Sequence, residues 1–279
     1  MSRSFRVACV QMNSGREFAP NIESAGDLVR RARDAGADFI ATPEITGMFE
    51  PVHALHLDKA LPEEEHPVLA AFRELAVETG AHILLGSQAV KLAPDRLANR
   101  SFLLDPSGRI MARYDKIHMF DVDLENGETY RESAVYQPGL EAVLADLPWG
   151  VLGLSICYDL RFPHLFRDLA QGGAEFIAIP AAFTAPTGRA HWHVLQRARA
   201  IETGCYIFAP AQWGEHAEGR RTFGHALIVD PWGTVLADAG EGVGFITADI
   251  DPDKSAEVRR MIPALRHDRA FSRGDVAAE

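Results

Sequence analysis

One cysteine stands at the end of a predicted strand rather than inside it. In the stretch "VLGLSICYDLRFP" an apolar run ends at Cys157, and polar and charged residues follow at once. A cysteine inside an apolar run is usually an inert core residue, which is what we expect of Cys9 and Cys205. Ligands of α/β proteins bind at the carboxyl ends of strands, and a helix beginning nearby, at Pro163, favours a thiolate. Cys157 is therefore a candidate nucleophile.

A nucleophilic cysteine also needs a base for its proton and a donor or cation for the oxyanion that forms on attack. None of the eleven histidines has a sequence context typical of such a base. Two other charged residues are better placed: Glu44 follows the apolar run "DFIATP", and Lys116 lies between "RIMARYD" and "IHMF". Each by itself is more often a surface ion-pair partner. Together with Cys157 they form a candidate set of nucleophile, base and cation.

The histidine and cysteine spacings do not indicate a metal site. His191 and His193 of "HWH" fall in a predicted helix, where residues two apart point to opposite faces. The three cysteines include no CxxC pair, so they indicate neither a disulfide framework nor a thiolate zinc site. A redox role for Cys157 has no obvious resolving cysteine. We therefore expect no bound metal.

The elements that position these residues follow an α/β pattern. Short apolar runs such as "FRVACVQM", "DFIATP", "VLGLSIC" and "EFIAIPAAF" alternate with segments of helical period. Helices are expected over residues 21–35, 67–79, 163–171 and 189–203, each followed within a few residues by glycine. Many strands are apolar on successive residues, which indicates that both of their faces are covered. The pattern predicts two sheets packed together between layers of helices.

An internal repeat divides the chain into two similar halves. "GADFIATP" at 36–43 recurs as "GAEFIAIP" at 173–180, and "LLDPSGRIMA" at 103–112 resembles "IVDPWGTVLA" at 228–237. The second pair is typical of two strands joined by a tight turn. A helix ending in Gly-Ala before a buried strand is common, so convergence stays open as an explanation. Because no linker separates the halves, we expect a single domain over residues 1–279.

Composition excludes several classes of partner. The chain carries 39 acidic and 28 basic residues, for a formal net charge of −11. Nucleic acids and anionic membranes bind clusters of Lys and Arg, so we expect neither as a partner. No apolar run approaches the roughly 20 residues of a membrane span, and "MSRSFRVACVQM" lacks the features of a signal peptide. We expect a cytoplasmic protein that acts on a small molecule.

Four motifs carry a resemblance to a known family. "TPEITG", "RYDKIHMFDVD", "SICYDLRFP" and "AFTAPTGRAHWHVLQRARAIETGCY" resemble the nitrilase, or carbon–nitrogen hydrolase, superfamily, and the resemblance covers nearly the whole chain. "ENGETYRES" and "GHALIVDPWG" are similar to its Nit branch. The resemblance implies a four-layer α-β-β-α sandwich with two pseudo-symmetric halves. It also implies a homodimer or higher oligomer, and we expect the C-terminal tail from about residue 263 to pack at its interface.

The resemblance implies a role for each candidate in amide hydrolysis. Cys157 would attack the amide carbonyl, Glu44 would act as general base, and Lys116 with the backbone N–H of Tyr158 would stabilise the oxyanion. Water activated by Glu44 would then hydrolyse an acyl thioester, with no metal or organic cofactor. Glu132 in "YRES" matches a position that orients the catalytic groups; the alternative for Glu132 is an exposed salt bridge in a loop.

Three further residues match positions that bind a substrate carboxylate in the Nit branch, namely Arg161, Phe183 and Thr187. An arginine fork can hold a carboxylate with two hydrogen bonds, while an ion pair between Arg161 and Asp159 is the structural alternative. The implied substrates are small carboxylate-bearing amides, either α-ketoglutaramate, the substrate of ω-amidases, or deaminated glutathione. The stretch over residues 201–234 favours deaminated glutathione, whose leaving group is Cys-Gly.

Other functions remain compatible with the same motifs. An N-carbamoyl amino acid amidohydrolase would use the same three catalytic residues. A true nitrilase usually carries a tryptophan-containing cysteine motif in place of "CYD". A catalytically silent binding protein on the same fold would not need the intact set of Glu44, Lys116 and Cys157.

Overall fold

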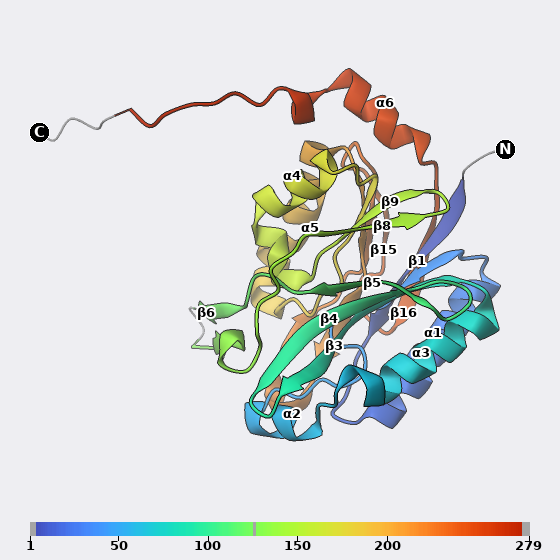
Figure 1. Ribbon diagram of the computed structural model, residues 1–279, viewed down its shortest axis with the longest axis vertical. Helices are drawn as coiled ribbons and strands as arrows, with labels where there is room; N and C mark the ends of the chain where they lie inside the picture. Colours follow the sequence, from blue (N-terminus) through green and yellow to red (C-terminus); the bar gives the residue numbers. More distant parts are fainter. Residues whose placement is uncertain (1–3, 125–126, 275–279) are drawn as a thin grey trace, which may run out of the picture.

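A computed structural model describes residues 4–124 and 127–274 of the chain (Figure 1). Its main body contains two large β-sheets. The first has the strand order β13 (Arg221–Phe223), β12 (Ala211–Glu215), β1 (Phe5–Met12), β2 (Phe39–Ala41), β3 (His82–Ala93), β4 (Arg96–Leu104) and β5 (Ile110–Asp115), with β16 (Gly244–Ile250) also paired to β1. The second has the order β15 (Val235–Asp238), β14 (Leu227–Val229), β11 (Tyr206–Ala209), β10 (Phe176–Ala178), β9 (Gly150–Leu154) and β8 (Val143–Leu147). A separate hairpin pairs β6 (Asp121–Asp123) with β7 (Thr129–Arg131).

Helices cover the outer face of each sheet. Helices α1 (Phe18–Asp34) and α3 (Pro67–Thr79) pack on the first sheet, and α4 (Pro163–Gln171) and α5 (Ala185–Thr203) pack on the second. The remaining helices are α2 (His53–Lys59) and α6 (Asp253–Met261). Short 3-10 turns occur at Glu63–Glu65, Glu132–Ala134, Cys157–Arg161, Ala217–Gly219 and Ala264–Arg266. The layers follow the order α-β-β-α, which confirms the predicted four-layer sandwich.

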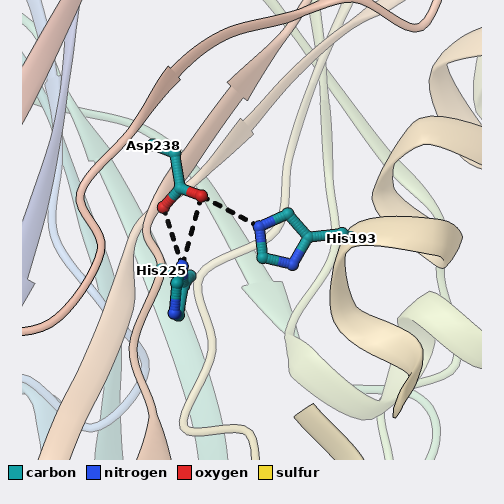
Figure 2. A group of neighbouring side chains, drawn as sticks. All are labelled: His193, His225 and Asp238. Carbon is teal, nitrogen blue, oxygen red and sulfur yellow. Dashed lines mark hydrogen bonds and ion pairs between the residues drawn. The ribbon is translucent and has the colours of Figure 1, made fainter. Parts of the chain in front are cut away.

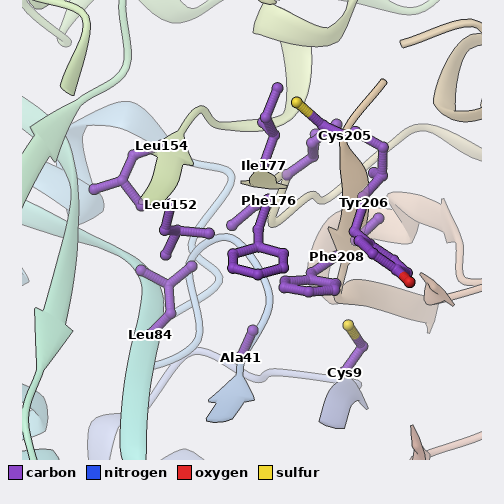
Figure 3. Close-up of a cluster of buried hydrophobic side chains, with 14 of the residues drawn as sticks. Cys9, Ala41, Leu84, Leu152, Leu154, Phe176, Ile177, Cys205, Tyr206 and Phe208 are labelled. Carbon is purple, nitrogen blue, oxygen red and sulfur yellow. The ribbon is translucent and has the colours of Figure 1, made fainter. Parts of the chain in front are cut away.

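The largest apolar cluster lies between the two sheets (Figure 3). Cys9, Leu84 and their neighbours on the first sheet face Leu152, Phe176 and Phe208 on the second, and all of these side chains are buried. Both faces of each sheet are therefore covered, which explains why the strands read as continuous apolar runs rather than alternating ones. Cys9 and Cys205 are fully buried core residues, as expected.

The two halves have matching topology. In the first sheet β1, β2 and β3 are parallel, and β4 and β5 follow antiparallel; in the second β9, β10 and β11 are parallel, and β14 and β15 follow antiparallel. The repeated "FIA" segments are β2 and β10, the central parallel strands. The internal repeat of the sequence thus marks two structurally equivalent units. The carboxyl ends of strands from both units lie close together at the candidate active site.

Two of the predicted helices have the observed bounds and two begin earlier. Helices α3 and α4 match residues 67–79 and 163–171, whereas α5 begins at Ala185 rather than residue 189, because Pro186 is favourable in a first helical turn. Helix α1 begins at Phe18 rather than Asn21. The Asn21 amide lies inside this helix and donates to the carbonyl oxygens of Gly15 and Gly47, at 2.8 Å each. The sequence did not predict α2 and α6.

After α6, residues 264–268 first contact α4, where Arg167 and Gln171 bond to Asp268, and the C-terminal tail then extends away from the body of the molecule (Figure 1). Phe271 in this tail is 92% exposed. Packing of the tail at an oligomer interface stays a prediction, and residues 275–279 lie outside the described part of the chain. Among the described residues, no helix has the length and apolarity needed to cross a membrane.

Candidate active site

Glu44 lies just beyond the end of β2, on a tightly packed turn. Ile45, the next residue, has a positive φ of 55°, which is rare for a β-branched residue and marks local strain. Its backbone N–H donates to the hydroxyl of Ser87, at 3.0 Å. Gly86 permits this close approach of β3, because a Cβ at this position would overlap the carbonyl oxygen of Thr42. This turn holds the buried carboxylate of Glu44 just beyond the end of β2.

Cys157 lies in the second half, beyond the end of β9, the strand that corresponds to β1. It begins a 3-10 turn that runs to Arg161, and its own φ is +48°, again in the left-handed region. The backbone N–H of Cys157 donates to the carbonyl oxygen of Pro180, at 2.9 Å. The N–H of Ala182, in the loop after β10, donates to Glu44 Oε2 at 2.8 Å. Strand ends of both halves therefore converge on the cysteine and the glutamate.

Lys116 follows β5 and places its ammonium group between two carboxylates. Its Nζ lies 2.9 Å from Glu44 Oε1 and 2.9 Å from Glu132 Oε2. Asn99 Nδ2 donates to the same two groups, at 2.9 Å to Glu44 and 3.2 Å to Glu132. The Glu132 side chain is only 13% exposed, so the alternative of an exposed loop salt bridge does not hold.

The charges of this cluster set the protonation of the thiol. Burial by itself raises the pKa of Glu44, but the Lys116 ammonium and its hydrogen bonds outweigh it, so the pKa of Glu44 lies below its ordinary value. Burial, followed by the negative charge of Glu44, raises the pKa of Cys157 well above that of a free thiol. The resting cysteine is therefore a neutral thiol beside an ionised carboxylate. Burial and the Glu44 charge thus oppose the thiolate that the nearby helix was expected to favour.

Asp159 joins the cysteine turn to the lysine segment, and the sequence did not predict this role. Its side chain is fully buried and accepts hydrogen bonds from the Tyr114 hydroxyl at 2.6 Å and from the backbone N–H groups of Ile156 at 2.8 Å and His118 at 3.0 Å. Asp159 therefore does not form the ion pair with Arg161 that was the structural alternative. The signal that could have identified Asp159 is its place two residues after the nucleophile, within a buried segment. Asn99 carried no such signal.

The cluster opens into a cavity of about 830 Å³. Glu44, Lys116, Glu132 and Cys157 line it, as do three of the other predicted residues, Tyr158, Phe183 and Thr187. Arg161 is not among the lining residues. Its guanidinium lies 5.2 Å from the ring centre of Phe183 and 5.8 Å from that of Tyr158, and contacts His191 Nδ1 at 3.3 Å. The roles of Tyr158, Arg161, Phe183 and Thr187 stay predictions.

A second side-chain cluster, drawn in Figure 2, includes none of the residues that line the cavity. His193 Nε2 on α5 lies 2.9 Å from Asp238 Oδ2, and His225 Nδ1 lies 2.9 Å from Asp238 Oδ1. Within the described part of the chain, these three residues are the one group whose ligand atoms lie close enough together to hold a metal ion. They already bond to one another, and the Gly240 N–H also donates to Asp238 Oδ1 at 2.8 Å. The cluster thus connects α5 to the end of β15.

The fold and the buried arrangement of cysteine, lysine and carboxylates are those expected of an amide-hydrolysing class of enzyme, and a family comparison gives the same class. The sequence model of the carbon–nitrogen hydrolase family matches residues 6–260. The chain belongs to this family and is an enzyme that hydrolyses carbon–nitrogen bonds in amides. The family membership argues against a catalytically silent binding protein.

More specific similarities point to one branch of the family. The chain is 40% identical over 274 residues to a deaminated glutathione amidase from Synechocystis sp., covering 95% of this chain and 98% of the relative. The human deaminated glutathione amidase is 39% identical over 271 residues, covering 94% and 82%. The Caenorhabditis elegans NitFhit protein superposes with a TM-score of 0.90 at 34% identity; the match covers 95% of this chain and 65% of that protein. Saccharomyces cerevisiae Nit3, a member of branch 10 of the nitrilase superfamily, gives a TM-score of 0.85 at 26% identity, covering 95% and 96%.

Proposed function

We propose that the enzyme hydrolyses deaminated glutathione through an acyl thioester on Cys157. The observation that carries the chemistry is the buried contact of Lys116 with Glu44 and Glu132 beside the cysteine, in one cavity. This arrangement supplies a nucleophile, a base and a cation without requiring any other group. The four catalytic residues and the substrate are the proposal; the hydrolysis of amides is the established class.

In the first half-reaction the sulfur of Cys157 attacks the amide carbon while the thiol proton moves to the Glu44 carboxylate. The carbonyl oxygen becomes an oxyanion, which the Lys116 ammonium and the Tyr158 backbone N–H stabilise. Glu44 then gives its proton to the amide nitrogen, and the carbon–nitrogen bond breaks. The amine of Cys-Gly leaves, and the α-ketoglutaryl group stays on sulfur as a thioester.

In the second half-reaction water attacks the thioester. Glu44 accepts a proton from the water, the same oxyanion donors act again, and the thiolate of Cys157 leaves and regains its proton from Glu44. The product is α-ketoglutarate. One carboxylate serves as base and acid in both steps, which requires that it be ionised in the resting enzyme, in agreement with its lowered pKa. Glu132 and Asn99 hold Lys116 and Glu44 in position.

Two observations support deaminated glutathione as the substrate. The chain is 40% identical to deaminated glutathione amidases along nearly its whole length. The cavity, at about 830 Å³, is near the upper end of the roughly 300–1,000 Å³ that ligand pockets usually span. Such a volume accommodates a substrate of tripeptide size, whereas α-ketoglutaramate would leave much of it to water.

The proposal predicts that the wild-type enzyme releases equal amounts of α-ketoglutarate and Cys-Gly from deaminated glutathione. The two products are measured in parallel over time, with α-ketoglutaramate as a second substrate. Activity on α-ketoglutaramate alone would make the enzyme an ω-amidase. If neither deaminated glutathione nor α-ketoglutaramate is hydrolysed while Cys157 still reacts with iodoacetamide, the next assay uses N-carbamoyl amino acids and measures the release of ammonia and carbon dioxide.

Arg161→Ala is expected to raise KM for a carboxylate-bearing amide by roughly 10- to 100-fold, because hydrogen bonds to charged groups contribute about 1.5–3 kcal/mol. The measurement compares α-ketoglutaramate with a neutral short-chain amide of similar size. The KM for the neutral amide should stay nearly unchanged. An equal effect on both substrates would remove Arg161 from carboxylate binding and leave it a support for the rings of Phe183 and Tyr158.

A further inference from the structure

A second arginine, Arg220, lies directly in the wall of the cavity. It follows the 3-10 turn Ala217–Gly219 and precedes β13. Its guanidinium carbon lies 4.9 Å from the ring centre of Phe49 and 4.9 Å from that of Tyr130, so the cation is held between two aromatic rings. Such a position orients the planar fork before any ligand arrives.

The loop that carries Arg220 is itself well fixed. The carbonyl oxygen of Arg220 accepts a hydrogen bond from the backbone N–H of His216, at 2.7 Å. The His216 ring stacks on Phe49 with centres 3.9 Å apart, and its two nitrogens contact the Ser14 carbonyl oxygen at 3.0 Å and the Thr222 hydroxyl at 2.8 Å. Burial, with a further contribution from the Arg220 charge, lowers the pKa of His216 to about 4, so this ring is neutral at pH 7.

Arg220 is charged but has no acidic partner among the described residues. Its Nε–H is buried and donates to no hydrogen-bond acceptor among the described residues. The other strong bases of the cavity are paired, Lys116 with two carboxylates and Arg131 with Asp123 at 2.8 Å. The nearby Glu218 binds Arg16 at 2.5 Å instead. The unpaired guanidinium lines the cavity, so a negatively charged ligand can supply the missing partner.

We propose that Arg220 binds the carboxylate of the leaving group, which in deaminated glutathione is the glycine carboxylate of Cys-Gly. The inference rests on the proposed substrate. Deaminated glutathione carries one carboxylate on the acyl group that stays on the enzyme and a second on the dipeptide that leaves, whereas α-ketoglutaramate carries only the first. An arginine fork matches a carboxylate with two parallel hydrogen bonds.

The two arginines contact different members of a row of aromatic rings formed by Tyr158, Phe120 and Tyr130. Arg161 lies on Tyr158, and Arg220 lies on Tyr130. Phe120 stands between these tyrosines, with ring centres 5.1 Å from Tyr158 and 5.0 Å from Tyr130. Arg220 lines the cavity, whereas Arg161 does not and contacts the lining rings of Tyr158 and Phe183, so a substrate carboxylate reaches Arg161 only if the arginine side chain turns into the cavity. The acyl-side carboxylate is the expected ligand of Arg161, and the leaving-group carboxylate that of Arg220.

The test is the effect of Arg220→Ala on two substrates. We expect KM for deaminated glutathione to rise by roughly 10- to 100-fold, the usual range for a lost charge-assisted hydrogen bond, while KM for α-ketoglutaramate stays within about twofold. Arg220→Lys should restore part of the loss, because the charge remains but the fork does not. The matched control is Arg221→Ala, which removes an exposed arginine one residue further along that does not line the cavity.

A modified substrate gives an independent readout. Esterifying the glycine carboxylate of deaminated glutathione should weaken wild-type binding as much as Arg220→Ala does, and should have almost no effect in the variant. Equal increases in KM for both unmodified substrates, or no increase for deaminated glutathione, would overturn the proposal.

Different experimental results would contradict the proposed function and the proposed role of Arg220. Lack of wild-type turnover of deaminated glutathione refutes the function. Binding of the compound to Cys157→Ala, measured by calorimetry with and without Arg220→Ala, then still decides the role of Arg220. Binding that is undetectable, or unaffected by Arg220→Ala, overturns it.

Discussion

Cys157→Ala is expected to fold normally and to lose roughly 10⁴-fold or more of kcat, as enzymes do when their covalent nucleophile is removed. Lys116 and the cavity remain in this variant, so substrate binding should persist while the acyl thioester cannot form. The measurement is product release from any amide that the wild type hydrolyses. Rapid acid quenching of the wild type followed by mass analysis should show the acyl group on the peptide that contains Cys157. The variant should show none.

The matched control is Cys205→Ala. Cys205 is also buried, and burial raises its pKa, but its sulfur donates to the carbonyl oxygen of Ala174 at 3.2 Å, far along the chain from the catalytic cluster. The kcat of Cys205→Ala should stay near that of the wild type. Activity of Cys157→Ala within tenfold of the wild type, or failure of that variant to fold, would contradict the role of Cys157 as a nucleophile at a strand end.

The backbone of Cys157 adds a stability readout. Its φ of +48° is unfavourable for alanine and acceptable for glycine. Cys157→Gly should therefore have a higher Tm than Cys157→Ala, although both are inactive. This difference would show that the fold holds the nucleophile in a strained conformation.

Much of the fold was predictable because the sequence repeats its own pattern. The two "FIA" strands and the two Asp-Pro-x-Gly turns mark equivalent positions, and the apolar runs indicate sheets covered on both faces. The bounds of α3 and α4 were predictable because a proline begins each helix and a glycine follows it. Helix α6 was not, since its sequence "DKSAEVRRM" is mostly polar and only Ser255 and Val258 are buried.

The candidate catalytic residues could be selected from the sequence as residue types at strand ends, but the charges that surround them could not. Nothing in the sequence shows that Glu44 and Glu132 share one lysine, or that Asn99 bonds to both. These contacts join segments far apart in the chain, so no local pattern reports them. Arg220 was missed for a related reason, because an arginine followed by a second arginine in a polar loop is normally a solvated pair. Only its position between Phe49 and Tyr130 distinguishes it from Arg221.

Glu44→Gln is expected to lower kcat/KM by roughly 10²- to 10⁴-fold, the usual contribution of a general base. Glutamine keeps the shape of the side chain, and Lys116 keeps its contacts with Glu132, at 2.9 and 3.0 Å. Removing Lys116 would be a poorer test, because it leaves two carboxylates without their cation, and breaking such a buried pair costs about 3–5 kcal/mol of stability. Glu63→Gln is a suitable control, since Glu63 pairs with Arg100 and Arg113 outside the cavity.

Two readouts separate a base from a structural carboxylate in Glu44→Gln. In the wild type the pKa of Glu44 lies below its ordinary 4.5, so the ionised base is lost only as the pH falls below that value. An acid limb of kcat/KM should therefore lie below pH 4.5, and the residual activity of the variant should lack it.

The second readout is the reactivity of the Cys157 thiol, which should increase in Glu44→Gln while hydrolysis slows. Burial and the Glu44 charge both raise the pKa of Cys157, so removing the charge should lower it and increase alkylation by iodoacetamide at pH 8. Faster alkylation with slower hydrolysis identifies Glu44 as the base; a parallel loss of both would mean that it only maintains the structure.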